Sequence, residues 1–307
     1  MSEYVVKTMG LSKKYGKNNA VYKCNINIRK GEIYGFIGKN GAGKTTIIRL
    51  LTGLIKPTEG SIELFGEQSE KGLCKARKRI GAIIENPALH PNLTAYENLE
   101  VSRIEKGIPG KKCIDEKLNL MELEDVKNRK VKDFSLGMKQ RLGIAMALIG
   151  DPELLILDEP VNGLDPSGIV ALRNILKKLN KEKNMTILVS SHLLGELHQI
   201  ATNYGIINNG QIIEEIDAYK LNQKCKKSLH VKVDNINKAT IVLEEKLKCK
   251  NYKVLPNNTL KLLDMVDEPG SISQAFSKEG IIIEGLSQVG DDLESYFMNL
   301  VGGSTIE

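Results

Sequence analysis

The stretch EIYGFIGKNGAGKTTIIRLL, Glu32 to Leu51, decides the fold. It opens with a short apolar run that predicts a strand, and it closes on a segment in which Ile47, Ile48 and Leu51, with Leu54 beyond them, fall on one face at helical spacing. A glycine-rich loop joins the two. Strand, glycine-rich loop and helix in immediate succession are the local order that binds phosphate groups.

The loop itself, GKNGAGKTT from Gly38 to Thr46, satisfies the pattern G-x-x-x-x-G-K-[ST]. Its glycines let the backbone wrap so that N–H groups point at phosphate oxygens, and the following helix adds the positive end of its dipole. We expect Lys44 to reach the β and γ phosphates of a nucleotide and the Thr45 hydroxyl to bind Mg²⁺. The residues expected to hold the nucleotide here are Gly38, Asn40, Gly41, Gly43, Lys44, Thr45 and Thr46.

Length and composition bound the architecture. With 307 residues, 41% of them hydrophobic, the chain is expected to be soluble and globular, with roughly two domains. Its five cysteines lie far apart and form no C-x-x-C pair, which argues against a disulfide framework or a zinc site. No segment approaches the roughly 18 uninterrupted apolar residues of a membrane span, so any membrane role is expected to depend on a partner.

Positive charge is concentrated in the first two thirds of the chain. Residues 1–215 hold 32 basic against 25 acidic residues, whereas residues 216–307 hold 12 against 13. Basic patches interleaved with aromatic residues, which would favour nucleic acid, are absent, and the chain has no Trp. The phosphates of a nucleotide are a sufficient explanation of the excess, and a solvated lysine-rich surface is the alternative for most of it.

A second motif, LLILDEP from Leu154 to Pro160, predicts a buried parallel strand that ends in two acids. Such a strand delivers Asp158 and Glu159 to the edge of the sheet where ligands bind in open α/β folds. Asp158 is expected to hold Mg²⁺ through water, and Glu159 to polarise the attacking water as general base. Adenylate-kinase-type and helicase proteins would share this much, and a plain surface loop is the alternative. Strands and helices that alternate through the first 215 residues predict an α/β sheet, with a mainly helical stretch at 94–149.

The segment DFSLGMKQRLGIAMAL, Asp133 to Leu148, predicts a helix that Ser135 caps and whose first turn contains Gly137. Its apolar positions Leu142, Ala145, Met146 and Ile149 are expected to face inward. Taken by itself, this helix start is equally compatible with a structural cap and with a second anion-binding end.

In combination these motifs resemble the ATP-binding cassette (ABC) ATPases. FSLGMKQR is similar to the LSGGQ-type signature of that family, with Ser135 and Gly137 matching and Leu136 and Met138 departing from the commonest letters. The resemblance extends over about residues 4–215. It implies roles for three further residues: Asp165 at the end of a D-loop (NGLD), His192 as the switch histidine that contacts the γ-phosphate, and Tyr15 as the ring that stacks on adenine.

Glu85 stands where most ABC ATPases carry the Gln of the Q-loop, in IGAIIENPALHPNLTAYENL, Ile80 to Leu99. A Glu there resembles the subgroup of ATPases that export lantibiotics, bacitracin and related peptide antibiotics. We expect Glu85 to reach Mg²⁺ through water and to link the nucleotide to the permease interface. A carboxylate that merely faces solvent is the alternative.

The remainder of the chain predicts a small second domain. Residues 228–307 show the order strand, helix, strand, strand, helix, strand, and a closing helix, which is a ferredoxin-like order. Residues 216–227 are expected to form a linker or short helix after an ABC ATP-binding domain at 1–215. The fold class is therefore α/β, with a mixed sheet and a helical subdomain, followed by an α+β accessory domain of packing or regulatory role.

The resemblance implies an ATPase that energises a separate membrane permease from the cytoplasmic face of the membrane. ATP and Mg²⁺ are the expected cofactors, a homodimer closed on ATP is the expected assembly, and neither nucleic acid nor the cargo is expected to contact this chain. Export of a peptide antibiotic or drug is the favoured function. A soluble ABC ATPase acting on ribosomes or nucleic acid, and an importer ATPase, are the alternatives.

Overall fold

The computed structural model describes residues 3–225, 228–289 and 293–302. It divides after Ala218 into two compact units, Met1–Ala218 and Tyr219–Glu307, and each is described by itself.

The first unit is built on a six-stranded sheet with the order β10-β9-β4-β8-β7-β6. All neighbouring strands are parallel except β9 and β10, which pair antiparallel. The predicted strands EIYGFIG and LLILDEP lie on either side of β8 in its centre, where every residue of β4, β7 and β8 is buried. The strands are β4 (Ile33–Ile37), β6 (Ile80–Ile83), β7 (Leu154–Asp158), β8 (Thr186–Ser191), β9 (Asn203–Asn208) and β10 (Gln211–Asp217).

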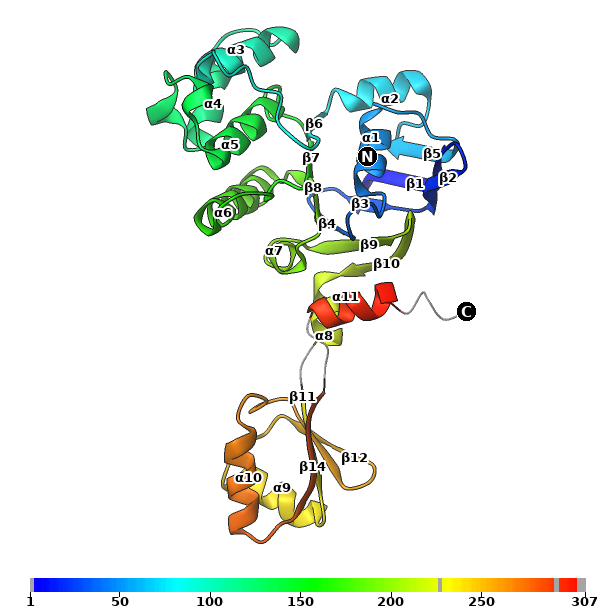
Figure 1. Cartoon of the computed structure of the whole chain (residues 1–307), viewed down its shortest axis with the longest axis vertical. Helices are drawn as coiled ribbons and strands as arrows, with labels where there is room; N and C mark the ends of the chain where they lie inside the picture. The colour runs from blue at the N-terminus through cyan, green and yellow to red at the C-terminus, as the bar shows by residue number, and fades with distance from the viewer. Residues whose placement is uncertain (1–2, 226–227, 290–292, 303–307) are drawn as a thin grey trace. The chain divides into compact units, whose positions relative to one another are not determined.

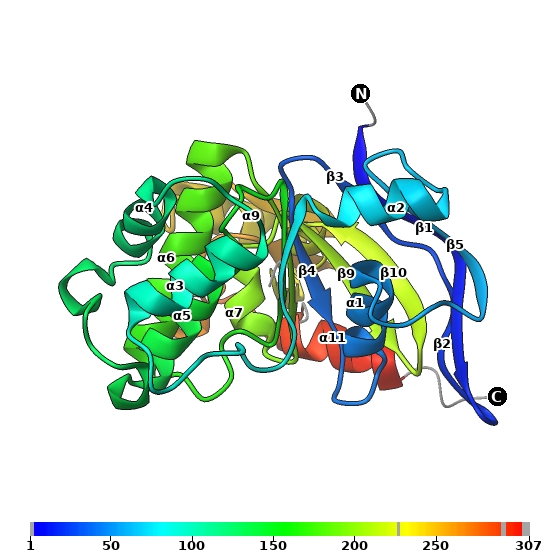
Figure 2. The same ribbon diagram turned by 90° about the horizontal axis from the view of Figure 1, so that it is seen from above.

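A second, antiparallel sheet joins β1 (Tyr4–Tyr15) to β2 (Asn18–Cys24), β3 (Asn27–Arg29) and β5 (Glu59–Leu64). Helix α1 (Lys44–Thr52) lies between the two sheets (Figure 2). Its buried Ile47, Ile48 and Leu51 join one apolar core with residues of both sheets. Leu54, predicted on the same face, is 66% exposed because the helix ends at Thr52 with Gly53 in the left-handed C-cap conformation.

Helices form a separate arm beside the large sheet (Figures 1 and 2). The predicted helix start at Thr94 is correct: its hydroxyl accepts from the Glu97 backbone N–H, and the Glu97 carboxylate accepts from the Thr94 N–H, which is a capping box. Of the expected inward positions of the signature helix, Leu142 and Ala145 are buried within it, Met146 is half-buried, and Ile149 is buried just past its end. The helices of the first unit that follow β5 are α2 (Glu70–Arg77), α3 (Ala95–Glu105), α4 (Lys112–Leu120), α5 (Leu136–Ala147), α6 (Pro166–Lys183) and α7 (Leu194–His198), with short 3₁₀ turns at Glu124–Val126 and Val131–Asp133.

The second unit begins within α8 (Ala218–Lys224), a helix that falls inside the predicted linker. Its antiparallel sheet has the order β12-β13-β11-β14, and helices α9 and α10 lie on one face of it (Figure 1). The predicted order of strands and helices is the order found, whereas parts of the predicted linker and of the closing helix lie outside the described residues. The elements are β11 (Ser228–Val233), α9 (Ile236–Glu245), β12 (Tyr252–Leu255), β13 (Thr259–Leu262), α10 (Pro269–Lys278), β14 (Ile283–Val289) and α11 (Leu293–Gly302).

Candidate nucleotide site

The glycine-rich loop runs from the end of β4 to the start of α1, as the sequence predicts. Gly43 has φ +111°, and a Cβ built on it would lie 2.7 Å from the Ala20 carbonyl oxygen. A Cβ on Gly38 would lie 2.7 Å from the Ile207 carbonyl oxygen. Both positions are therefore closed to other residues by backbone atoms of β2 and β9, against which the loop packs closely.

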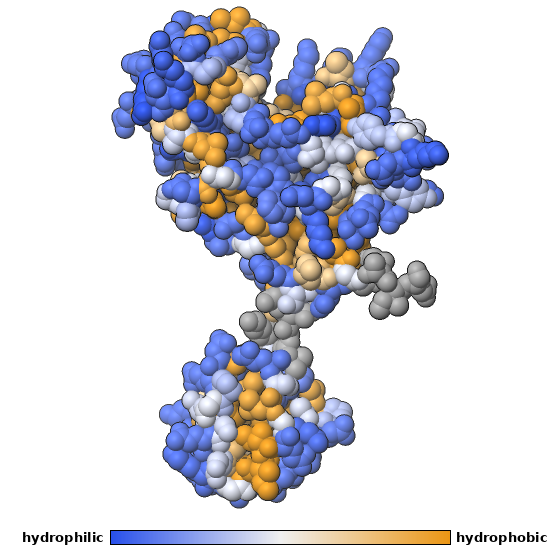
Figure 3. Space-filling view, viewed as in Figure 1, coloured by the Kyte–Doolittle hydropathy of each residue, from blue (hydrophilic) through white to orange (hydrophobic). Residues whose placement is uncertain are grey.

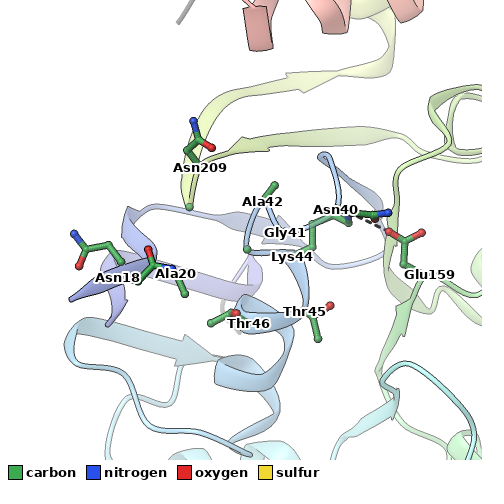
Figure 4. Close-up of a pocket in the computed structure, with 13 residues that line it drawn as sticks. Asn18, Ala20, Asn40, Gly41, Ala42, Lys44, Thr45, Thr46, Glu159 and Asn209 are labelled. Atoms are coloured by element: carbon green, nitrogen blue, oxygen red, sulfur yellow. Dashed lines mark ion pairs between the residues drawn. The ribbon is translucent and has the colours of Figure 1, made fainter. Parts of the chain in front are cut away.

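Lys44 lies at the centre of the site and is only 5% exposed. Its ammonium donates to the carbonyl oxygens of Gly38 at 2.6 Å and Lys39 at 3.3 Å. It also forms an ion pair with Glu159, with Nζ 3.1 Å from Oε1 (Figure 4). The ammonium of Lys44, which is predicted to bind the nucleotide phosphates, is thus held in this structure by the loop carbonyl oxygens and by Glu159, the predicted general base.

Thr45 and Asp158 meet as the metal prediction requires. The Thr45 hydroxyl donates to Asp158 Oδ2 at 2.7 Å, and the Ser190 hydroxyl donates to Oδ1 at 2.5 Å. Asp158 is 1% exposed and lies directly opposite Ser190 in the parallel pairing of β7 with β8. A hydroxyl and a buried carboxylate are the hard oxygen ligands that Mg²⁺ prefers, so this donor set fits the metal.

Glu159 is held from several directions. Its backbone has φ +50°, an unusual conformation for a residue with a side chain, and its N–H donates to the Ser190 hydroxyl at 2.9 Å. Its Oε2 lies 2.8 Å from His192 Nδ1. Oε1 is buried and has no hydrogen-bond partner among the described residues, although it forms the ion pair with Lys44. The structure thus brings the three predicted catalytic residues together in one chain of contacts.

A cavity of about 590 Å³ opens over the loop (Figure 4). Asn18 and Ala20 of β2 lie on one side of it and Glu159 lies on the other. Tyr15 does not line the cavity but pairs with Asn18 in the β1–β2 register, and it is 49% exposed. No motif in the sequence predicted the part of the wall formed by Asn18, Asn19, Ala20, Asn209 and Gly210.

Ser135, Gly137 and Asp165 lie elsewhere, around a second hollow of about 340 Å³ that shares no lining residue with the first. Ser135 caps α5, and its hydroxyl accepts from the Met138 N–H at 3.3 Å. Asp165 caps α6 in the same way through the Gly168 N–H, and a hydrogen bond from the Ser167 hydroxyl lowers the pKa of its carboxyl. Each chain therefore carries a phosphate-binding loop and, apart from it, a pair of capped helix starts.

Glu85 follows β6 in a left-handed conformation, with φ +64°. Its Oε1 lies 2.6 Å from Nη2 of Arg49 on α1, and their side chains are 60% and 41% exposed. Glu85 does not line the cavity over the loop. Arg49 is a partner that the sequence analysis missed, since a contact between residues 36 positions apart leaves no local pattern.

Comparison with known proteins agrees with this geometry. The family model described as ABC transporter matches residues 21–162. The bacitracin transport ATP-binding protein BcrA of Bacillus licheniformis is 44% identical over 98% of this chain and 99% of its own length. The chain belongs to the ABC transporter family. It is an ATP-hydrolysing subunit of such a transporter, and the predicted ABC cassette fold is confirmed.

Two further proteins are similar to the ABC cassette of this chain. The lantibiotic transport ATP-binding protein SrtF of Streptococcus pyogenes is 48% identical over 69% of this chain and 90% of its own length. Among solved structures, a dimeric ATP-binding cassette in a post-hydrolysis state bound to ADP and Pi is 30% identical, with a TM-score of 0.63 over 69% of this chain and 98% of that one. ATP is thus the nucleotide that this chain binds and hydrolyses as a transporter subunit.

Proposed function

We propose that this ATPase energises the export of a peptide antibiotic through a separate membrane permease. The observation that carries the proposal is the 44% identity with a bacitracin transport ATP-binding protein along nearly the whole of both chains, the second unit included. Glu85, in place of the commoner Gln, is the residue on which the resemblance to this subgroup rests. Relatives that are named as transport proteins disfavour a ribosomal or nucleic-acid role.

Two copies would close head to tail on two ATP molecules. The phosphate-binding loop with Lys44 and the capped start of α5 with Ser135 and Gly137 line different hollows of one chain, so neither hollow alone surrounds a γ-phosphate. Hydrogen-bond donors from a second copy would then contact the remaining side of the γ-phosphate and stabilise its negative charge. The dimeric state of a 30% identical cassette supports this assembly. Tyr15 and Asp165 would contact the adenine and the partner at the edges of the same interface.

Hydrolysis would follow from the contacts around Glu159. Thr45 and Asp158 would hold Mg²⁺, which when bound neutralises charge that develops on the phosphates. ATP phosphates would draw Lys44 away from Glu159 and leave its carboxylate free to accept a proton from water. His192 would keep that carboxylate oriented through its Nδ1 contact, and Ser190 would fix the backbone beneath it.

The permease would dock on a groove of about 450 Å³ that borders Glu85. The groove is mainly apolar, and apolar surface is exposed on the helical arm that forms one of its walls (Figure 3). Ile84 and Asn86, on either side of Glu85, both line it, as does Thr52 at the end of the Arg49 helix. Nucleotide and permease would thus act on one short segment of chain.

Within the described residues, no helix is long and apolar enough to cross a membrane. We place the protein at the cytoplasmic face of the membrane, held there by the permease, which would also carry the cargo site.

The test is a mild-detergent pull-down of the Glu159→Gln variant with ATP and Mg²⁺ from the native host. A polytopic membrane protein is the expected partner, and host cells that lack it should accumulate or become sensitive to the exported peptide. Recovery of ribosomal protein or nucleic acid with no membrane protein would overturn the proposal. Lys44→Ala, which removes the phosphate contact, serves as the matched control for nucleotide dependence.

A further inference from the structure

The sheet of the second unit has one covered face and one face that α9 and α10 leave uncovered. Leu229, Val231 and Leu260 point toward the helices and share a core with them. Because side chains alternate along a strand, the residues between them point to the opposite face.

Three basic side chains lie in one row across the uncovered face. Lys253 on β12 pairs directly with Lys261 on β13, and Lys261 pairs directly with His230 on β11. We call Lys253, Lys261 and His230 the basic row. Residues directly opposite one another on neighbouring strands hold their Cβ atoms about 5 Å apart, and like charges in such pairs are destabilising.

The described part of the chain leaves this repulsion uncompensated. Within residues 3–225, 228–289 and 293–302, no carboxylate forms an ion pair with Lys253 or Lys261. Other lysines of the same unit are matched: Lys232 pairs with Glu284 at 2.8 Å and Lys246 with Glu279 at 2.5 Å. Lys253 and Lys261, two cations without a carboxylate partner in that part of the chain, thus lie directly opposite each other on adjoining strands.

His230 supplies a second, independent observation. Its Nε2 is buried and has no hydrogen-bond partner among the described residues. Burial, together with the nearby charge of Lys261, lowers the pKa of the imidazole. A buried polar atom without a partner is uncommon in a folded protein and points to a group that the protein itself does not supply.

We propose that the basic row binds a phosphate-bearing anion. Lys253 and Lys261 stand at paired positions of neighbouring strands, and Ser287, opposite His230 on β14, adds a hydroxyl on the same face. An anion there would offset the repulsion between Lys253 and Lys261. Movement of the Lys261 side chain would give the anion access to the His230 imidazole. Soluble phosphates and phospholipid headgroups share this chemistry, and the experiment separates them. The site is independent of the nucleotide cavity and of the cargo that the transporter moves.

The test uses the full-length protein and NMR signals of the His230 imidazole, assigned from their absence in His230→Gln. Inorganic pyrophosphate is expected to shift these signals in the parent protein. Removal of charge-assisted hydrogen bonds in Lys253→Ala/Lys261→Ala is expected to weaken the response at least about tenfold. Lys250→Ala/Lys278→Ala, which removes the same charge from exposed positions of the same unit, is expected to respond like the parent. All variants should hydrolyse ATP at the parent rate.

Flotation with vesicles of phosphatidylglycerol and phosphatidylcholine distinguishes the two sources. Flotation that the row variant loses and the control variant keeps identifies a lipid headgroup, whereas a pyrophosphate response alone identifies a soluble phosphate. The proposal is overturned if neither probe distinguishes the row variant from the control variant.

Discussion

Removal of Arg49 should make the ATPase easier to activate with Mg²⁺. The structure holds Glu85 on Arg49 at 2.6 Å, away from the cavity where Thr45 and Asp158 meet. If Glu85 serves the metal, it must first leave this ion pair. Arg49→Ala removes that cost, so the Mg²⁺ concentration that gives half the maximal rate should fall.

The size of the effect follows from exposure. A bare Coulomb estimate for a pair near a protein surface gives about 4 kcal/mol at 4 Å. Both side chains are more than a third exposed, however, and pairs of this kind contribute about 0.2–1 kcal/mol in practice. That range corresponds to a change of about 1.4-fold to fivefold in the half-saturating concentration. Salt near 1 M, where the screening length is about 3 Å, should abolish the difference.

The assay is steady-state ATP hydrolysis titrated with Mg²⁺ at low and high salt. Lys56→Ala is the matched control, because Lys56 also loses an exposed ion pair, with Glu70, at 3.1 Å. In a Glu85→Ala background, Arg49→Ala should change nothing further. The reasoning would be refuted if Lys56→Ala and Arg49→Ala lowered the half-saturating Mg²⁺ concentration equally. It would also be refuted if Arg49→Ala still lowered it in the Glu85→Ala background.

Three other outcomes are expected. Glu159→Gln should bind ATP but hydrolyse it at least about 10²-fold more slowly, and so accumulate as an ATP-bound dimer in size-exclusion chromatography; hydrolysis at the parent rate would refute its role as base. Ser190→Ala should raise the half-saturating Mg²⁺ concentration several-fold, because Asp158 loses the hydrogen bond that orients Oδ1; Ser191→Ala, one residue further along β8, is the control. Arg103 and Lys111 lower the pKa of Glu100 to about 2, so the stability this carboxylate contributes should be complete above pH 4.5 and lost as the pH falls toward 2; urea unfolding of Glu100→Gln should lack that loss, and an unchanged acid limb would contradict it.

The sequence could predict which residues meet around the glycine-rich loop, because their placement depends on local spacing. Lys44 and Thr45 follow a turn of fixed length, and Asp158 and Glu159 end a strand that is apolar throughout. Local spacing also gave the element order of the second unit. It misplaced Leu54, although the glycine just before it was the available signal for the end of the helix.

The residues that hold those groups in place were beyond reach, because strand register and helix docking bring them together. Ser190 lies two residues before His192, and its hydroxyl donates to Asp158 and accepts from the Glu159 N–H, a role that the sequence did not predict. It can do so only because β8 is the direct neighbour of β7, which no local pattern states.

One hydroxyl therefore ties the predicted metal ligand to the predicted base. Loss of that hydroxyl should disturb both together: the rise in the Mg²⁺ requirement of Ser190→Ala should be accompanied by a fall in the maximal rate. Thr45→Ser, which keeps the hydroxyl that donates to Asp158 Oδ2, should leave both nearly unchanged. A change in the metal requirement alone would mean that Lys44 and His192 suffice to hold Glu159 in place.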